Sequence, residues 1–393
     1  MFANELLLFP TSGRSHYRIP SVIVTKNGTA LAFCNDRKDT VADEAAEVSL
    51  VLSVKEPNGT WSPIRALAEV PGWGCGIGSA VYDDLTDTAM CFFSRTPIVR
   101  SEWGDYTKEQ LDEMERRSAA LARQLGVEQG AFLLKSTDSG KTWTEMRHQV
   151  EPYLLTTADG QTHSVKGGCH GSAHGIRLRH GLHQGRLLCP SRSVIGTYRN
   201  FDELSRCCFN NAIYSDDHGE TWHTSAPVQW GTGEGTLIET ADGTVTYNSR
   251  AYFRDQKRYL ASSTDGGETW GDFQTDAFLL EEKWIGCNAS FLRVETSELS
   301  DRSLLPNGAD SVTVFVNPRA ETRQNMTACI SFDDGKTWSR TKTICESECA
   351  YSSLAFSSVE QRFFLMYEKG SGGDPYRQGI AMLTFDLAWL LSE

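Results

Sequence analysis

Short apolar runs separated by turn residues dominate the hydrophobic pattern of this 393-residue chain. Residues 21–25 and 30–33, for example, flank Asn27-Gly28, a pair that favours the tight turn of a β-hairpin. Another strand, predicted at residues 185–189, is expected to end at Pro190, because proline cannot donate a hydrogen bond to a ladder. The pattern predicts more than twenty short strands, and therefore an all-β fold.

An eight-residue phrase, Ser-x-Asp-x-Gly-x-Thr-Trp, recurs along the chain after apolar runs. Its four copies span residues 136–143, 215–222, 263–270 and 331–338. Asp can accept hydrogen bonds from the backbone of a turn, Gly tolerates positive φ, and Trp offers a large apolar surface that can pin the turn to a sheet. These Asp-boxes predict hairpin turns that staple the fold and carry no chemistry of their own.

The spacing of the Asp-boxes indicates a repeated architecture. They begin at residues 136, 215, 263 and 331, and a degenerate copy lies at residues 58–61. A propeller blade of four strands takes roughly 40–50 residues, so one interval fits a single blade and the longer intervals fit blades with insertions. We expect a six-bladed β-propeller that forms one domain over residues 1–393, with residues 6–9 pairing with residues 380–385 to close the ring.

One segment departs from the strand pattern. Residues 106–125 carry apolar side chains on one helical face, Thr107 and Gln110 form a potential capping box, and Gly126 follows as a C-cap. The segment predicts an amphipathic helix, at about 106–126, inserted in a β-protein. We expect it to cover a surface edge; the alternative is a lid over a propeller mouth.

Composition and charge narrow the possible partners. The formal net charge of −13 argues against nucleic acid and anionic membranes. No apolar run approaches ~20 residues, so no membrane span is expected. The N-terminal segment lacks a basic stretch and contains Glu5, so it does not resemble a signal peptide; a cytoplasmic location, or a signal already removed, is expected. A site for an anion would have to be built locally from arginines.

Cysteine and histidine patterns do not indicate a metal or a disulfide framework. The eleven cysteines are scattered without any CxxC spacing, which favours buried thiols. His163, His170 and His174 fall in one stretch, but their gaps are irregular, so we expect loop and pocket-rim residues rather than zinc ligands. No cofactor is expected.

The segment Tyr17-Arg18-Ile19-Pro20, together with the Asp-boxes, resembles the exo-sialidases (neuraminidases) of the large bacterial and animal glycoside hydrolase family. The resemblance extends from Tyr17 to Tyr367, with the remaining elements in the family's order. It implies a six-bladed propeller that cleaves terminal α-linked sialic acids from glycoproteins, glycolipids and other sialylated glycans.

The resemblance also implies three arginines that clamp the substrate carboxylate. Arg18 matches the first and Arg250 the second, and Arg323 is a better match for the third than its rival Arg319. Planar, permanently charged guanidinium groups suit a planar carboxylate because both can form paired hydrogen bonds. Glu368 matches a carboxylate that orients the first arginine, and Arg37 matches an additional arginine that lines the pocket.

By the same resemblance, Tyr351 is the nucleophile and Glu234 is its partner carboxylate. Sialidases are exceptions to the two-carboxylate rule of glycosidases. Their anomeric carbon bears a carboxylate, which would repel a carboxylate nucleophile. A phenol with a pKa near 10 stays neutral until an adjacent glutamate takes its proton.

The acid/base residue is expected in the charged loop at residues 35–47. Asp43 is the best match, Asp39 the second and Asp36 the third. On this interpretation Asp43 protonates the leaving oxygen while Tyr351 attacks, and water then resolves the covalent tyrosyl-sialoside with net retention.

Two departures from the family pattern concern the substrate subtype. Residues 171–176 lack the usual Gly-Pro-Gly turn, and the inserted helix is not part of the common core. Trp103 and residues 73–78 are further candidates for pocket lining. A trans-sialidase, an anhydro-forming enzyme and a hydrolase of a related nonulosonic acid, such as the deaminated form, remain open, as does a non-catalytic propeller that binds sugars or proteins.

Overall fold

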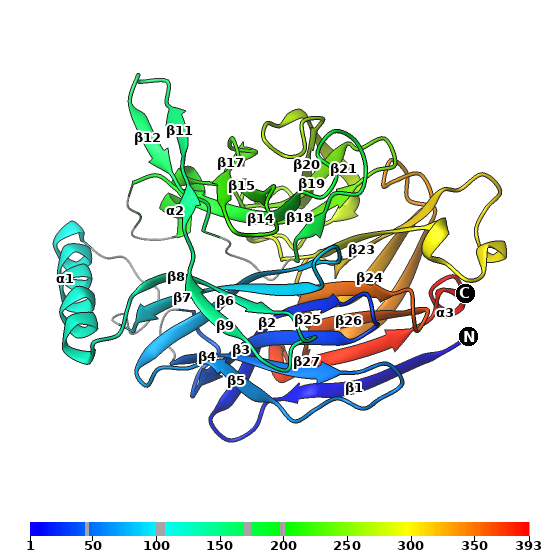
Figure 1. Ribbon diagram of the computed structural model, residues 1–393, viewed down its shortest axis with the longest axis horizontal. Helices are drawn as coiled ribbons and strands as arrows, with labels where there is room; N and C mark the ends of the chain where they lie inside the picture. The colour runs from blue at the N-terminus through cyan, green and yellow to red at the C-terminus, as the bar shows by residue number, and fades with distance from the viewer. Residues whose placement is uncertain (44–46, 99–106, 169–173, 197, 199–200, 393) are drawn as a thin grey trace.

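A computed structural model describes residues 1–392 except 44–46, 99–106, 169–173, 197 and 199–200. Its fold is all-β, as predicted, with most of the chain in antiparallel strands (Figure 1). Short hairpin turns join successive strands, so that each sheet is built mainly from neighbours in sequence. Within the described residues, no helix is long and apolar enough to cross a membrane.

The first sheet contains two antiparallel runs of four strands. The first run is β2 (Ser15–Val24), β3 (Ala30–Lys38), β4 (Val48–Lys55) and β5 (Arg65–Ala68). The second run is β6 (Trp73–Asp83), β7 (Thr88–Pro97), β8 (Gly130–Ser136) and β9 (Thr144–Arg147). A single parallel pair between β4 and β6 joins them.

The middle of the chain forms three smaller sheets. One contains β10 (Val150–Glu151), β13 (Ile176–Arg177), β14 (Leu187–Val194), β15 (Cys208–Ser215), β16 (Trp222–Thr224) and β17 (Gln229–Trp230). Another contains β18 (Thr232–Glu239), β19 (Val245–Ala251), β20 (Lys257–Ser263) and β21 (Gly271–Leu280). Between β10 and β13, the hairpin of β11 (Tyr153–Thr156) and β12 (Thr162–Val165) projects from the body of the molecule (Figure 1).

The last sheet unites the two ends of the chain. It contains β22 (Ser290–Glu295), β23 (Ser311–Pro318), β24 (Gln324–Ser331), β25 (Arg340–Ser357), β26 (Arg362–Ser371), β27 (Asp374–Phe385) and β1 (Ala3–Pro10). The first half of β25 pairs with β24 and its second half with β26, so one long strand belongs to two runs. Leu6 pairs with Met382 and Phe9 with Ile380, which confirms the predicted pairing of the terminal segments.

The Asp-box at residues 215–222 shows how these turns are built. The Ser215 hydroxyl donates to Asp217 at 2.8 Å and accepts from the amide of Gly219 at 2.8 Å. Asp217 accepts from the amide and hydroxyl of Thr221 at 2.8 and 2.6 Å. Partial burial opposes the charged form, but the bonds from Thr221 outweigh it and hold the pKa of Asp217 at about 2. Equivalent bonds form in the other copies.

Each of these turns packs against a neighbouring part of the fold. Gly219 has a φ of 82°, and a Cβ there would lie 2.6 Å from Sδ of Met90 in β7. Trp222 lies edge-on to Phe92 of the same strand, with ring centroids 4.9 Å apart. The copy at residues 136–143 packs on β3 in a similar way. The predicted stapling role of the Asp-boxes is therefore confirmed for these two copies.

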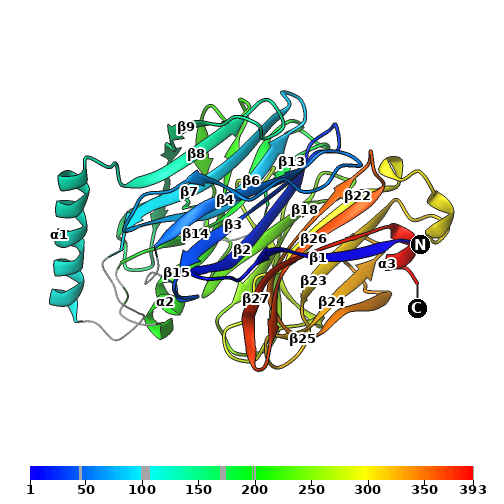
Figure 2. The ribbon, with the colours of Figure 1, turned by 90° about the horizontal axis from the view of Figure 1, so that it is seen from below.

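The inserted helix α1 (Lys108–Leu125) lies at the periphery in both views (Figures 1 and 2). Thr107 and Gln110 form the predicted capping box, and Gly126 caps the C-terminus with a φ of 62°. Ser118 is the only buried residue of α1, which fits a surface element better than a core helix. Tyr106, predicted as its first residue, lies outside the described residues. The shorter helices are α2 (Phe201–Cys207) and α3 (Leu387–Leu390).

Candidate active site

The candidate site lies at one end of the sheets, where the first strand of a run begins and the second strand ends. Arg18 lies in the first half of β2, and Arg37 near the end of β3. Glu234 lies near the beginning of β18, and Arg250 near the end of β19. Because the paired strands are antiparallel, these positions meet at the same end. Tyr351 of β25 joins them through its hydroxyl, which donates to Glu234.

A bulge in β2 positions the first arginine. The pairing of β2 with β3 shifts between Arg18 and Ser21, and Ile19 has a φ of 61°. A β-branched residue rarely adopts this left-handed backbone, so tertiary contacts must hold it there. The amide of Ile19 and the Nε of Arg18 both donate to Oε1 of Glu368, at 2.9 and 2.6 Å. The bulge therefore directs Arg18 onto a buried carboxylate.

Glu368 connects this arginine to the strand that carries the predicted nucleophile. Its side chain is fully buried, and its second oxygen accepts from the backbone amide of Tyr351 at 3.1 Å. The Arg18 guanidinium also lies over the ring of Tyr376, 3.7 Å from the ring centroid. Glu368 thus contacts Arg18, the arginine that the resemblance pairs with it, and also accepts from the backbone of Tyr351.

Tyr351, Glu234 and Arg250 form a closed set of hydrogen bonds. The Tyr351 hydroxyl donates to Oε1 of Glu234 at 2.8 Å and accepts from Nη1 of Arg250 at 2.6 Å. The same Nη1 of Arg250 also donates to the other oxygen of Glu234. The Nε of Arg250 donates to the carbonyl of Ile285 at 2.9 Å, which fixes the plane of its guanidinium.

The protonation states of this set follow from its surroundings. Burial raises the pKa of Tyr351 well above that of a free phenol, although Arg250 opposes the shift. Burial also disfavours the charged form of Glu234, but Arg250 and the hydrogen bond from Tyr351 outweigh it and lower the pKa of Glu234. The pair at rest is therefore a neutral phenol beside a carboxylate that can accept its proton.

Arg323 contributes a third guanidinium to the site, and its rival Arg319 does not. Arg323 donates to the hydroxyl of Tyr376 and to the carbonyl of Gly286, the latter at 3.2 Å, and its guanidinium lies 5.6 Å from the ring centroid of Tyr351. Arg319 instead donates to the carbonyl of Phe278 at 3.3 Å and lies over the ring of that residue. The geometry favours Arg323, as the sequence did.

Asp43 lies at the site, paired with Arg37. Nη1 of Arg37 is 2.6 Å from Oδ1 of Asp43, and the Asp43 side chain remains 59% exposed. The two alternatives are occupied elsewhere: Asp39 forms an exposed pair with Arg14, and Asp36 pairs with Lys38. Glu44, its neighbour in sequence, lies outside the described residues.

The arginines also set the charge of Asp43. Desolvation works to raise its pKa, but Arg37 and Arg18 outweigh desolvation, so the pKa of Asp43 lies below the usual value. In the free protein Asp43 is therefore an anion over most of the pH range. A group that neutralised Arg37 and Arg18 would raise the pKa of Asp43 again.

Arg192 is a site residue that the sequence analysis missed. It lies near the end of β14, as Arg37 does in β3 and Arg250 in β19. Its charge contributes to the lowered pKa of Glu234, and its buried Nε has no hydrogen-bond partner among the described residues. The signal was concealed because Pro190 was expected to end this strand. In fact β14 continues to Val194.

The described residues thus place an excess of positive charge at one point of a strongly acidic protein. The guanidinium groups outnumber the carboxylates. The guanidinium groups belong to Arg18, Arg37, Arg192, Arg250 and Arg323, and the carboxylates to Asp43, Glu234, Glu282 and Glu368. Such a cluster is suited to bind an anion by charge-assisted hydrogen bonds. No group of three His, Cys, Asp or Glu side chains is arranged to hold a metal, within the part of the chain that the structure describes.

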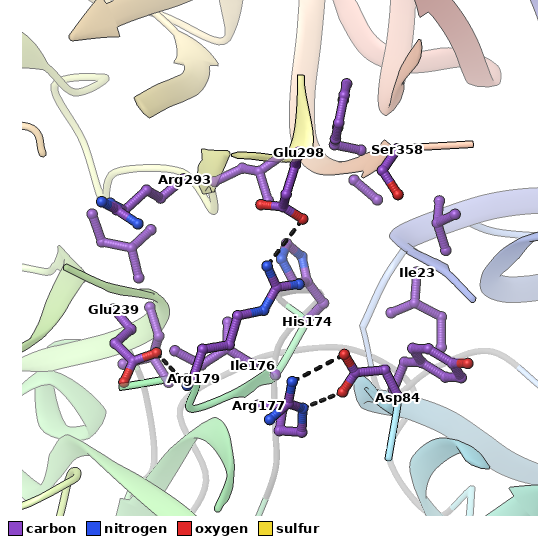
Figure 3. Close-up of a pocket in the computed structure, with 18 of the residues that line it drawn as sticks. Ile23, Asp84, His174, Ile176, Arg177, Arg179, Glu239, Arg293, Glu298 and Ser358 are labelled. Atoms are coloured by element: carbon purple, nitrogen blue, oxygen red, sulfur yellow. Dashed lines mark hydrogen bonds and ion pairs between the residues drawn. The ribbon is translucent and has the colours of Figure 1, made fainter. Parts of the chain in front are cut away.

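A cavity of about 550 Å³ lies at the opposite end of the same strands (Figure 3). Strands β2, β18 and β25 run from the candidate site to this cavity, where their far ends line it. Several of its charges are paired: Arg177 with Asp84, and Arg179 with Glu298 at 3.0 Å. These pairs join separate runs of strands, so we interpret the cavity as a structural junction and not as the reacting site.

Several residues proposed for pocket lining do not lie at the site. Trp73 is fully buried in the core, so its prediction as a lining residue is wrong. His174 lines the opposite cavity, and His163 lies in the β11–β12 hairpin. Trp103 and His170 fall outside the described residues.

The chain is similar in sequence to known proteins over most of its length. Residues 28–359 match the family model described as a BNR repeat-like domain. The sialidase of Micromonospora viridifaciens is 29% identical over 396 residues, which cover 98% of this chain and 54% of the relative. The exo-alpha-sialidase of Aspergillus fumigatus is 26% identical over 412 residues, covering 97% of this chain and 86% of the relative.

Similarity also extends to solved structures. The intramolecular trans-sialidase from Ruminococcus gnavus, solved with oseltamivir carboxylate, superposes with a TM-score of 0.68 over 96% of both chains, at 14% identity. At that identity the superposition shows a shared fold. The chain spans about half the length of the Micromonospora relative.

Proposed function

The chain belongs to the sialidase (neuraminidase) family, and we propose from this that it is a retaining exo-α-sialidase that hydrolyses terminal sialic acids from glycoproteins, glycolipids and other glycans. One observation supports the proposal above all others: the Tyr351 hydroxyl lies between Glu234 and Arg250. A neutral phenol held against an ionised carboxylate is an activated nucleophile.

Binding of the substrate carboxylate would use the arginine cluster. Arg18, Arg250 and Arg323 surround the ring of Tyr351, with guanidinium carbons 5.6, 5.7 and 5.6 Å from its centroid. A carboxylate bound among them would bring the adjacent anomeric carbon to the Tyr351 hydroxyl. Binding energy from the carboxylate would then orient the reacting atoms.

In the first step the Tyr351 oxygen would attack the anomeric carbon while Glu234 takes the phenolic proton. The bond to the leaving oxygen breaks, and Asp43 supplies the proton that this oxygen needs. The substrate carboxylate would neutralise the arginines that lower the pKa of Asp43, so that Asp43 can take up a proton on binding. In the second step Asp43 would accept a proton from water, which attacks the anomeric carbon and breaks its bond to the Tyr351 oxygen. Glu234 would return its proton to that oxygen, and the two displacements together give net retention.

Hydrolysis of a fluorogenic α-sialoside by wild type, Tyr351→Phe and Asp43→Asn tests this mechanism. Tyr351→Phe should lose at least about a hundredfold in kcat, because it has no nucleophilic oxygen. Tyr259→Phe, which removes a surface hydroxyl bonded to Asp255, is the matched control and should retain wild-type rates. Full activity in Tyr351→Phe would overturn the mechanism, and sugar binding without turnover in wild type would favour a lectin-like protein.

Transfer to an acceptor or formation of an anhydro sugar is the second candidate, because the Ruminococcus structure with the same fold is an intramolecular trans-sialidase. The three arginines Arg18, Arg250 and Arg323 and the Tyr351–Glu234 pair would serve all of these reactions. They would equally serve hydrolysis of a related substrate, the deaminated nonulosonic acid. Product analysis separates them, since hydrolysis releases free sialic acid and the intramolecular route releases an anhydro sugar.

The proposed activity fits a six-bladed β-propeller in which residues 1–393 form one domain. Support comes from the repeated runs of four antiparallel strands and from the pairing of β1 with β27. On this proposal β25 supplies the outer strand of one blade and the inner strand of the next.

A further inference from the structure

The loop between β21 and β22 supports two arginines of the candidate site through its backbone. The carbonyl of Ile285 accepts from Nε of Arg250 at 2.9 Å, and the carbonyl of Gly286 accepts from Nη2 of Arg323 at 3.2 Å. Gly286 has a φ of 68°, and a Cβ there would lie 2.4 Å from Oε2 of Glu281, so the position suits glycine. The path of this loop is therefore coupled to the position of both guanidinium groups.

A buried ion pair holds the residue that follows these two carbonyls. Oε2 of Glu281 accepts from the amide of Cys287 at 2.6 Å, and Nη1 of Arg258 donates to the carbonyl of Cys287 at 2.9 Å. The same Nη1 lies 3.1 Å from Oε1 of Glu281. The ion pair thus fixes both backbone polar groups of Cys287, and with them the end of the loop that supports the arginines.

The ion pair is also bonded to the strands on either side of it. Arg258 of β20 donates to the side-chain and backbone oxygens of Asn248, at 2.7 and 3.2 Å. Asn248 lies on β19, two residues before Arg250. Asn317, near the end of β23, donates to the carboxylate of the ion pair at 2.9 Å, and the chain after β23 leads to Arg323. The ion pair therefore connects the strand of Arg250 with the segment that carries Arg323.

Stability is a weak reason for this ion pair to lie in the core. Arg258 is fully buried, and Glu281 is 2% exposed. Removing two charges from water costs free energy that their mutual attraction only partly offsets, and apolar side chains of similar volume often stabilise a core equally well. The bonds of the pair to the loop and to both strands instead give these segments defined relative positions.

We propose that Arg258 and Glu281 are positioning residues that set the spacing of Arg250 and Arg323 for the substrate carboxylate; the inference rests on the proposed function. A shift of Cys287 would move the two loop carbonyls, and the guanidinium groups would follow them. Guanidinium groups that are displaced or tilted cannot both form well-aligned hydrogen bonds with one carboxylate. Loss of the ion pair therefore weakens binding of the carboxylate more than binding of the rest of the sugar.

The test compares two inhibitors that differ only at the carboxylate: the 2,3-didehydro analogue of sialic acid and its neutral methyl ester. The ratio of Ki for the ester to Ki for the acid measures what the arginines contribute to binding. Glu281→Gln keeps the shape of the side chain but removes its charge, and it should lower this ratio by about threefold to tenfold. Asp334→Asn is the matched control, because it removes the carboxylate partner of Arg293 at the opposite cavity, and it should leave the ratio unchanged.

Two double variants keep the test decisive if Glu281→Gln does not fold, since it leaves the charge of Arg258 buried without a partner. Arg258→Met combined with Glu281→Leu removes both charges and both bonds to Cys287, so it should lower the ratio at least as far as the single variant. Arg258→Met combined with Glu281→Gln provides an acceptor for the Cys287 amide again and should recover part of the ratio. Circular dichroism at the assay temperature identifies the folded variants.

The outcomes separate this inference from the proposed function. An unchanged ratio in the folded variants, or an equal weakening of both inhibitors, would overturn the positioning role and leave the sialidase proposal intact. A wild-type protein that neither hydrolyses a sialoside nor prefers the acid to the ester would overturn both.

Discussion

Glu368 shows how one buried carboxylate can hold several parts of a site. Its oxygens accept from the side chain of Arg18 and from the amides of Ile19 and Tyr351. A carboxylate removed from water is stable only when such partners replace its lost hydration. Arg18, the strained bulge at Ile19 and the strand that carries Tyr351 are therefore all bonded to one carboxylate, which fixes their positions relative to one another.

The substitution Arg37→Gln should move the alkaline limb of the pH profile of kcat/KM to higher pH. Desolvation raises the pKa of Asp43 in the free protein, but the charges of Arg37 and Arg18 lower it by more, so the net shift is downward. An acid works only while protonated, so a depressed pKa places the alkaline limb at low pH. Removal of the Arg37 charge raises the pKa of Asp43, and the limb must follow it upward.

Initial rates with a fluorogenic α-sialoside at low substrate concentration, across the acidic and neutral range, measure this limb. Arg14→Gln removes a guanidinium that pairs with the exposed Asp39 and should leave the limb where it is. A limb that stays in place or moves to lower pH in Arg37→Gln would show that another group is the acid.

The Asp-box is the element that gives the fold its regular frame. In the copy at residues 215–222, hydrogen bonds from Thr221 to Asp217 close the turn, and Gly219 lets it approach Met90. The turn joins the third and fourth strands of its run, and the third strand leads away from the candidate site. The Asp-boxes therefore act on stability and not on substrate.

Asp217→Ala should lower the free energy of unfolding by about 1–2 kcal/mol, because it removes the acceptor for the Thr221 amide and hydroxyl. Urea unfolding followed by tryptophan fluorescence measures the change, and KM should stay at the wild-type value. Asp159→Ala is the matched control: Asp159 accepts from Thr157 in the exposed β11–β12 turn, which is not packed on a neighbouring run. A raised KM in Asp217→Ala would contradict the stapling role.

Elements fixed by local sequence were predictable, and elements that depend on tertiary neighbours were not. The hairpins, the Asp-box turns and both caps of α1 follow from Gly, Asp and Thr at defined positions. Pro190 was misjudged because β14 pairs with β13 only at Leu187 and Leu188, so in the described part of the chain its missing donor faces no partner strand. Continuation of that strand is what brings Arg192 to the site.

The same distinction applies to the site residues. Arg18, Glu234, Arg250 and Tyr351 could be located because each occupies a recognisable sequence position. Tyr376 could not, since its importance lies in a ring beneath Arg18 and a hydroxyl that accepts from Arg323, contacts made across the fold. Burial of Trp73 likewise depends on its neighbours in space.

At the scale of the molecule, the terminal strands complete one sheet. Strand β1 pairs with β27 along its length, and the two termini lie close together in both views (Figures 1 and 2). Phe9 of β1 is fully buried, 5.5 Å from the ring of Tyr17, which precedes Arg18. The N-terminal strand is thus packed directly behind the candidate site.

Phe9→Ala should cost about 3–5 kcal/mol of unfolding free energy, because it leaves a cavity between β1 and β2. Circular dichroism and tryptophan fluorescence should shift together in urea if the sheets unfold as one unit. Phe2 directly precedes β1 and is 41% exposed, so Phe2→Ala should change the free energy of unfolding by less than about 1 kcal/mol. Two separate transitions would indicate that the last sheet unfolds independently.

The continuity of β25 has a consequence for how the chain tolerates insertions and deletions. Side chains alternate along a strand, so one residue gained or lost reverses every position beyond it. Arg340–Ser357 runs without a turn from β24 to β26, with Tyr351 in its second half. A length change in the preceding turn can be absorbed locally, whereas one directly beside Tyr351 would turn its side chain away from Glu234. The number of residues in this strand therefore sets the position of Tyr351 relative to Glu234.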